Sequence, residues 1–494
     1  MVETGPREAQ YSPAKPEVED SLPLLGDLGT TTLSCDSPAP ISRSPSQPRD
    51  GWYAVGFLGH FAVTILLSFA EGGKRETESA FLMSGYDAGS WASILMIVCL
   101  LSAIIGLILA GFGLMDSSVR GEVLSTGVLM ANILVQICVG NTFLLLKEHY
   151  SFGLYFLSSA LMCLVRYRMH ASRLAFLGSL MDLVTEVFSA YQYTLVVACA
   201  LALAAQTLVL LWWGAFFVSL FSSSLPLGAL IGEWPTLLFL LFSWYWITQF
   251  FQALVSFVLG GCVLWYYEAR RLEGKEEVNP GGARVRLYST CALTSSLGSV
   301  CKGGLYAGLS SRVLSLSNLF VEQRDYALAL RSTYVAHFYD TCITLMAPLT
   351  LFARRNNKLA LSISAAYGFT YSKSGIDQYN KYPQSVDMLL LDADEEMQTL
   401  NALGNTVSGT MALVFALSAQ NTGSSRSLFL LLVYLMAYSG VTLSLHCYSA
   451  AIYGFVVAYS NEETIVPPDS IPVLRWGRKL EERRHGVHRV PDEL

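Results

Sequence analysis

The chain has 494 residues, of which 53% are hydrophobic and only 14% are charged, and its formal net charge is −6. Its mean hydropathy of +0.44 lies outside the usual pattern of soluble domains. The basic residues sit in short segments instead of one face or stripe, which argues against a nucleic-acid partner. Composition therefore excludes an ordinary soluble domain and indicates a membrane protein.

Ten apolar stretches alternate with polar connections along the chain. Most can cross the roughly 30 Å hydrocarbon layer, which takes about 20 apolar residues as a helix. Because a bilayer offers the backbone no water, such runs should be helices. The stretches are Trp52–Ala70, Trp91–Leu114, Val123–Leu146, Phe152–Val165, Tyr193–Phe221, Pro235–Tyr267, Thr290–Val313, Thr333–Phe352, Gly404–Ala419 and Leu428–Tyr459. We therefore expect an all-α, polytopic membrane helix bundle of about ten transmembrane helices.

The distribution of basic residues predicts the orientation of the bundle. Most of the 32 lysines and arginines fall in the two tails and the even-numbered connections. The positive-inside rule places these segments, and both termini, in the cytosol. Residues 1–50 are rich in Ser and Pro and contain no apolar run, which predicts a disordered cytosolic tail. The transmembrane domain is expected at 51–460, and a cytosolic tail at 461–494.

The N-terminal tail contains one candidate sorting signal. Asp20 precedes the pair Leu24 and Leu25 at the spacing of an acidic dileucine sorting signal. A functional signal would bind a sorting adaptor and direct the protein to endolysosomal membranes. Chance matches are common in a tail that contains leucine, so the plasma membrane and the endolysosomal membrane both remain open.

The sequence shows no signature of an enzyme or of a metal site. It has no carboxylate cluster, nucleophile motif or metal-ligand spacing, and His337 with Asp340 does not match an H-x4-D acyltransferase string. Of the ten cysteines, only Cys35 clearly lies outside an apolar stretch, so the cysteines predict buried apolar side chains and no disulfide framework. We expect no catalytic residues, no metal and no cofactor.

Two opposite charges lie in neighbouring apolar stretches. Lys302 is near the middle of the seventh stretch, and Asp340 is in the facing half of the eighth. A lone charge there would cost several kcal/mol, so we expect the two to form a buried pair, which His337 could join. Such a pair could fix the register of the helices, or it could act as a gating or coupling pair for an ion or proton.

Several local strings share their order and spacing with one family. They are Trp246-Ile247-Thr248-Gln249, Leu297-Gly298-Ser299-Val300-Cys301-Lys302-Gly303-Gly304-Leu305, Asn357-Lys358-Leu359-Ala360, Ala366-Tyr367-Gly368-Phe369-Thr370-Tyr371-Ser372-Lys373-Ser374 and Tyr448-Ser449-Ala450-Ala451. Together they make the chain resemble the choline transporter-like family over roughly residues 234–463. The resemblance implies a membrane transporter for choline or ethanolamine. The chain departs from the family pattern at Lys302 and Tyr453.

The resemblance implies a substrate whose chemistry can be compared with the residues. Choline is a permanent cation with no hydrogen to donate from its nitrogen, and aromatic faces can hold it at about 0.5–2 kcal/mol per contact. The expected substrate-binding residues are Trp246, Gln249, Tyr306, Tyr448 and Tyr453. Trp246, Tyr306 and Tyr453 could form an aromatic cage. Tryptophan and tyrosine also form interfacial belts and fill helix contacts, so packing is the competing interpretation.

Two classes of function follow from the sequence. The first is a transporter in the lipid bilayer for choline or a related small organic cation. The second is a non-transporting membrane scaffold or regulator that retains the family fold.

Overall fold

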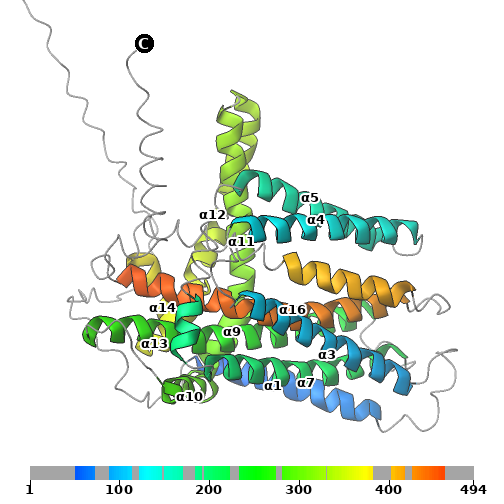
Figure 1. Cartoon of the computed structure of the whole chain (residues 1–494), viewed down its shortest axis with the longest axis horizontal. Coiled ribbons are helices and arrows are strands. Elements are labelled where there is room, and N and C mark those ends of the chain that lie inside the picture. Colours follow the sequence, from blue (N-terminus) through cyan, green and yellow to red (C-terminus); the bar gives the residue numbers. More distant parts are fainter. Residues whose placement is uncertain are drawn as a thin grey trace, which may run out of the picture. The chain divides into compact units, whose positions relative to one another are not determined.

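A computed structural model describes residues 50–72, 88–113, 122–146, 150–170, 184–191, 194–222, 233–273, 281–329, 331–381, 402–417 and 426–461. Every regular element within these residues is a helix (Figure 1). The labelled helices are α1 (Gly51–Gly72), α3 (Ala88–Gly113), α4 (Glu122–Leu145), α5 (Tyr150–His170), α7 (Thr194–Ser222), α9 (Glu233–Glu273), α10 (Gly281–Leu293), α11 (Leu297–Ala329), α12 (Thr333–Arg355), α13 (Leu359–Tyr367), α14 (Tyr371–Lys381) and α16 (Arg426–Asn461). Two more helices cover residues 184–190 and 402–417. The expected all-α class is confirmed.

Each of the ten predicted stretches overlaps at least one helix, and the helices differ in length from the stretches. The segments that are long and apolar enough to cross a membrane are Thr194–Val218, Pro235–Ala269, Thr333–Tyr367 and Phe429–Ala458. Shorter apolar helices are Gly51–Leu67, Ser93–Ile108, Met130–Leu145, Tyr150–Val165 and Ala402–Leu417. These apolar helices support a membrane protein, while the count of ten spans remains a prediction.

The long helices α9 and α16 pack against each other and are the most buried of the segments that can cross a membrane. Their contact is close because it is made by glycines. A Cβ atom on Gly454 would lie 2.9 Å from the Cβ of Val263 and 3.0 Å from the Cα of Gly260. Small residues allow this approach between membrane helices, where van der Waals packing drives association. Helices α3 and α7 also contact α16, and α13 contacts both α9 and α16.

The seventh predicted stretch, Thr290–Val313, is not one helix. Helix α10 ends at Leu293, residues 294–296 form a turn in which the Ser296 N–H donates to the Cys291 carbonyl at 2.9 Å, and α11 begins at Leu297. Helix α11 then continues to Ala329, well beyond the predicted end. The break places Lys302 in the second turn of α11 instead of the middle of a span.

Two short helices follow α12. The backbone of Gly368 has φ 71°, a left-handed conformation that ends α13 and turns the chain into α14. Helix α13 is buried along its length and packs on α9, where the Cα of Ser362 approaches Gly260. The sequence placed this region in a cytosolic connection, but its burial makes it part of the packed bundle.

Some expectations lie outside the described residues. They concern the disordered tail up to residue 49, the sorting signal at Asp20, Leu24 and Leu25, and the C-terminal tail from residue 462 onward. Asp50, the last residue assigned to the N-terminal tail, is described, and it contributes to the site below.

Candidate functional site

Asp50 joins three parts of the chain that are far apart in sequence. Its carbonyl accepts the Tyr53 N–H at 2.9 Å at the start of α1. One carboxylate oxygen accepts the Ser299 hydroxyl at 2.9 Å and the Tyr371 N–H at 3.0 Å. Tyr371 is the first residue of α14, and the first N–H groups of a helix have no partner within it. The negative charge also suits the positive end of the helix dipole.

Lys302 completes this centre from α11. Its ammonium Nζ lies 3.6 Å from the Asp50 Oδ1, and both side chains are only 13% exposed. The same ammonium donates to the hydroxyl of Ser372 and lies 4.9 Å from the centroid of the Tyr53 ring. A nearly buried ammonium therefore has a carboxylate, a hydroxyl and an aromatic face as neighbours, which together offset the cost of removing it from water.

A group of aromatic rings adjoins this centre. Tyr53 and Tyr306 meet edge to face with centroids 5.9 Å apart, and their hydroxyl oxygens are 3.5 Å apart. Tyr306 also meets Phe352 of α12 edge to face at 5.5 Å. These contacts bring α1, α11 and α12 together around Tyr306, which is itself only partly buried. Edge-to-face pairs of this kind add about 0.5–1.5 kcal/mol beyond the area that they bury.

A second aromatic group lies further along α1, around Phe57 and His60. Trp246 of α9 contacts Phe57 at 5.3 Å and His60 at 5.5 Å between ring centroids. Its indole N–H donates to the Cys301 carbonyl at 3.3 Å. This bond ties α9 to the residue before Lys302, so Trp246 helps to position the lysine.

The glycines of the string around Lys302 let α11 approach its neighbours. A Cβ on Gly304 would lie 3.0 Å from backbone atoms of Phe250 on α9, and a Cβ on Gly303 would collide with Leu361 of α13. One turn later, the side-chain amide of Gln249 lies over Gly308, in the space that a side chain there would need. The spacing Gly303, Gly304 and Gly308 therefore fixes how close α11 sits to α9 and α13.

The string that starts at Asn357 holds the other side of the centre. The Ala360 N–H donates to the side-chain oxygen of Asn357 at 3.2 Å, which caps the start of α13. The Tyr371 hydroxyl donates to the Asn357 carbonyl at 3.1 Å. Burial raises the pKa of the Tyr371 phenol well above its usual range, so the phenol stays neutral and keeps its proton for this bond. Tyr371 is thereby held with its N–H directed at Asp50.

A comparison with protein families identifies the class of protein that contains this site. A family model described as plasma-membrane choline transporter matches residues 154–464. The chain belongs to this family. Family membership indicates a membrane transporter, which acts on a small molecule within a lipid bilayer. No curated protein sequence matches the chain.

The matched region contains Lys302, Tyr306 and Tyr371 but not the residues of α1. Asp50 and Tyr53 therefore complete a centre whose other members belong to the family region. The resemblance noted from local strings is confirmed by this match.

The expected pair of Lys302 with Asp340 is wrong. Asp340 is 50% exposed, and its Oδ1 lies 3.7 Å from the Nη1 of Arg324. Helices α11 and α12 pack against each other across the short turn at residues 331–332, so residues at similar distances from that turn meet. Asp340 faces Arg324 for this reason, whereas Lys302 lies 22 residues before Arg324, or about 33 Å along a helix axis. His337 is exposed and lies on the same distant part of α12.

The three rings of the expected cage contact different neighbours. Trp246 packs on α1, Tyr306 packs on Tyr53 and Phe352, and the Tyr453 ring lies 5.7 Å from the ammonium of Lys358. Tyr448 and Tyr453 are buried in α16, each 2% exposed. Tyr306 adjoins the charged centre, because it contacts the same Tyr53 ring that faces Lys302.

Sequence reasoning missed Asp50, Tyr53, Ser299 and Ser372. Asp50 falls in the predicted N-terminal tail, and Tyr53 lies within the first apolar stretch, Trp52–Ala70, where no role is assigned to it. One signal could have suggested Asp50: it is an acid directly before a membrane helix, where a counter-ion for a lysine in a span could lie. No local pattern specifies which lysine it meets.

Proposed function

We propose that the chain carries choline or a related small organic cation across the membrane. The observation that supports this substrate class is the Tyr53 ring, which already holds an ammonium group, that of Lys302, at 4.9 Å from its centroid. Tyr306 and Phe352 extend the aromatic surface beside it. A quaternary ammonium needs such faces because it has no N–H to donate.

The charge of the centre is compatible with a cationic substrate. An unneutralised ammonium at Lys302 would repel choline, but Asp50 lies 3.6 Å away and offsets it. The role that the sequence assigned to Asp340 thus falls to Asp50. We propose that the Lys302–Asp50 pair acts as the gating or coupling pair, because it links α1, α11 and α14 at one point.

We assign the first substrate contact to Tyr306, since it is accessible and adjoins the centre. Gln249 covers Gly308, which lies two residues beyond Tyr306 on α11, so we propose it as a polar contact for the hydroxyl of the substrate. Trp246, Tyr448 and Tyr453 are nearly buried, so we propose that they contact substrate in other conformations of the transport cycle.

The proposal includes ten spans with both termini in the cytosol, a cytosolic tail at residues 1–50, a transporter domain at 51–460 and a second tail at 461–494. The family description supports the plasma membrane as the location. An endolysosomal location would require the adaptor signal at Asp20, Leu24 and Leu25. Tags at either end should be inaccessible from outside intact cells, and labelling of either tag would contradict the topology.

The decisive experiment is uptake of radiolabelled choline into proteoliposomes that contain the purified protein. Tyr306→Leu should weaken choline binding by about tenfold or less, because one aromatic contact at a partly exposed site contributes about 0.5–1 kcal/mol. Tyr334→Leu is the matched control, since that ring is 90% exposed and lies on α12 away from the centre. Uptake of a neutral or anionic solute in place of choline would overturn the substrate assignment.

One observation favours the alternative of a non-transporting scaffold or regulator. The ammonium of Lys302 occupies the face of Tyr53 that a substrate cation would use. A folded protein that takes up neither choline nor ethanolamine, and still does not when Lys302→Met exposes that face, would support the scaffold.

A further inference from the structure

A cavity of about 450 Å³ lies among α7, α9 and α10, which contact one another. We propose that it binds one acyl chain of a glycerophospholipid from the surrounding bilayer. Its wall is made almost entirely of apolar side chains, among them Ala198, Ala202, Phe251, Val255, Leu259 and Leu293. We refer to it below as the acyl cavity, and it is separate from the centre formed by Asp50 and Lys302.

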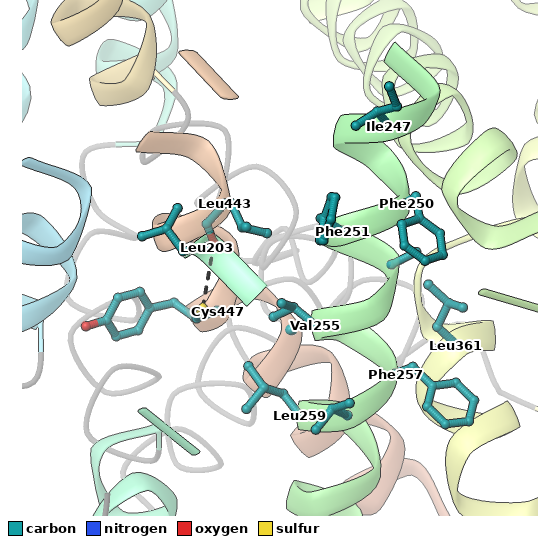
Figure 2. Packing of buried hydrophobic residues seen from close by; sticks show 14 of the residues in the cluster. Leu203, Ile247, Phe250, Phe251, Val255, Phe257, Leu259, Leu361, Leu443 and Cys447 are labelled. Carbon is teal, nitrogen blue, oxygen red and sulfur yellow. Dashed lines mark hydrogen bonds between the residues drawn. The ribbon is translucent and has the colours of Figure 1, made fainter. Parts of the chain in front are cut away.

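The acyl cavity exists because small residues face large ones. On α7, Ala198, Ala202 and Ala205 follow one another at helical spacing and line the same side of the cavity. Across from them, Phe251, Val255 and Leu259 recur every four residues along one face of α9 (Figure 2). Alanine is too short to reach that face, so the space between the helices is left unfilled, with a volume typical of ligand sites.

The apolar lining of the acyl cavity determines which class of ligand it can bind. A cavity lined by apolar groups gives water no hydrogen-bond partners and does not retain it. Two residues of the lining reach the outer surface, since Leu201 is 67% exposed and Leu293 is 54% exposed. Helix α7 is apolar enough to cross a membrane, so this surface faces lipid tails. An acyl chain can therefore enter from the side and fill the volume.

A polar group at one end of the acyl cavity favours a phospholipid. Ser289 of α10 belongs to the lining, and Arg286 precedes it by three residues, with Leu293 seven residues after Arg286, so all three share one helix face. Arg286 is exposed, and its guanidinium can bind a phosphodiester in the head-group region. A sterol offers no such anion, which is why we commit to a phospholipid.

The test is photocrosslinking of the purified full-length protein in vesicles that contain phosphatidylglycerol with a diazirine in one acyl chain. This probe has no choline head group, so it does not compete for the proposed transport site. The expected result is label concentrated on peptides of α7 and α9 that line the acyl cavity. Label spread evenly over the exposed apolar faces of α3, α4 and α7 would overturn the proposal without any variant.

Two variants on α7 sharpen the test. Ala202→Phe fills the acyl cavity and should reduce its labelling to background, while Ala204→Phe, an exposed neighbour outside the lining, should leave the labelling unchanged. Arg286→Gln should lower labelling by the anionic probe. Displacement of the label by excess sterol but not by excess phosphatidylglycerol would assign the cavity to a sterol and refute the phospholipid. Loss of choline transport with labelling intact would concern the proposed function alone.

Discussion

Asp50→Ala is the substitution that tests the charged centre most directly. The carboxylate is the counter-ion of Lys302 and the acceptor for Ser299 and for the first N–H of α14. Its removal leaves an ammonium that is only 13% exposed without its carboxylate. Breaking a buried pair in this way costs about 3–5 kcal/mol, and we expect Asp50→Ala to fall in that range.

The structure also predicts an asymmetry between the two partners. Lys302→Met leaves the Asp50 carboxylate with two hydrogen-bond donors, the Ser299 hydroxyl and the Tyr371 N–H, so we expect a smaller loss of about 1–3 kcal/mol. In the double variant no lysine is left without its counter-ion. Its loss should therefore be smaller than that of Asp50→Ala alone, and it should fall below the sum of the two single losses by at least about 1–3 kcal/mol.

These differences in stability can be measured by thermal unfolding in detergent, with circular dichroism as the readout. Asp340→Ala is the matched control, because its half-exposed contact with Arg324 should contribute under about 1 kcal/mol. Additive losses in the double variant would show that Asp50 and Lys302 do not interact. A larger loss for Asp340→Ala than for Asp50→Ala would restore the pairing first expected from the sequence.

Three further substitutions test the packing around the centre. Gly304→Val should reduce the free energy of unfolding by about 3 kcal/mol or more in the same thermal assay, because the new side chain would meet the Phe250 backbone. Gly59 has open space around it, so Gly59→Ala should be tolerated. Tyr371→Phe should cost about 0.5–1.5 kcal/mol by removing the bond to Asn357, with no effect if that bond is absent in solution. Asn357→Ala should cost about 1 kcal/mol as a lost cap, measured beside Asn356→Ala.

Apolar length predicted the helices of the bundle because the requirement is local. A run such as Pro235–Tyr267 must satisfy its own backbone groups, and the structure places it within α9. The boundaries of α11 could not be predicted in this way. Its second half contains Arg324 and Asp325, which read as a polar loop, yet the backbone remains helical to Ala329 and packs along α12.

The error in the predicted length of α11 explains why the predicted partner of Lys302 was wrong. With a span ending at Val313, Lys302 seemed to share a depth with Asp340, whereas the longer helix places Arg324 there instead. The identity of a charge partner depends on helix length, register and neighbour, and none of these is visible in a local string. The presence of a partner for Lys302 was predictable, because the cost of a lone buried charge does not depend on which acid supplies it.

The bond from Tyr371 to Asp50 spans 321 positions of the chain. A ribosome that adds roughly 5–20 residues per second needs about 15–65 s to reach α14 after α1 has been made. Throughout that interval Asp50, directly before α1, carries a carboxylate whose three partners have not all been synthesised. Asp50 is thus synthesised early and paired late, because a chain that stops before α14 leaves its carboxylate without the Tyr371 N–H.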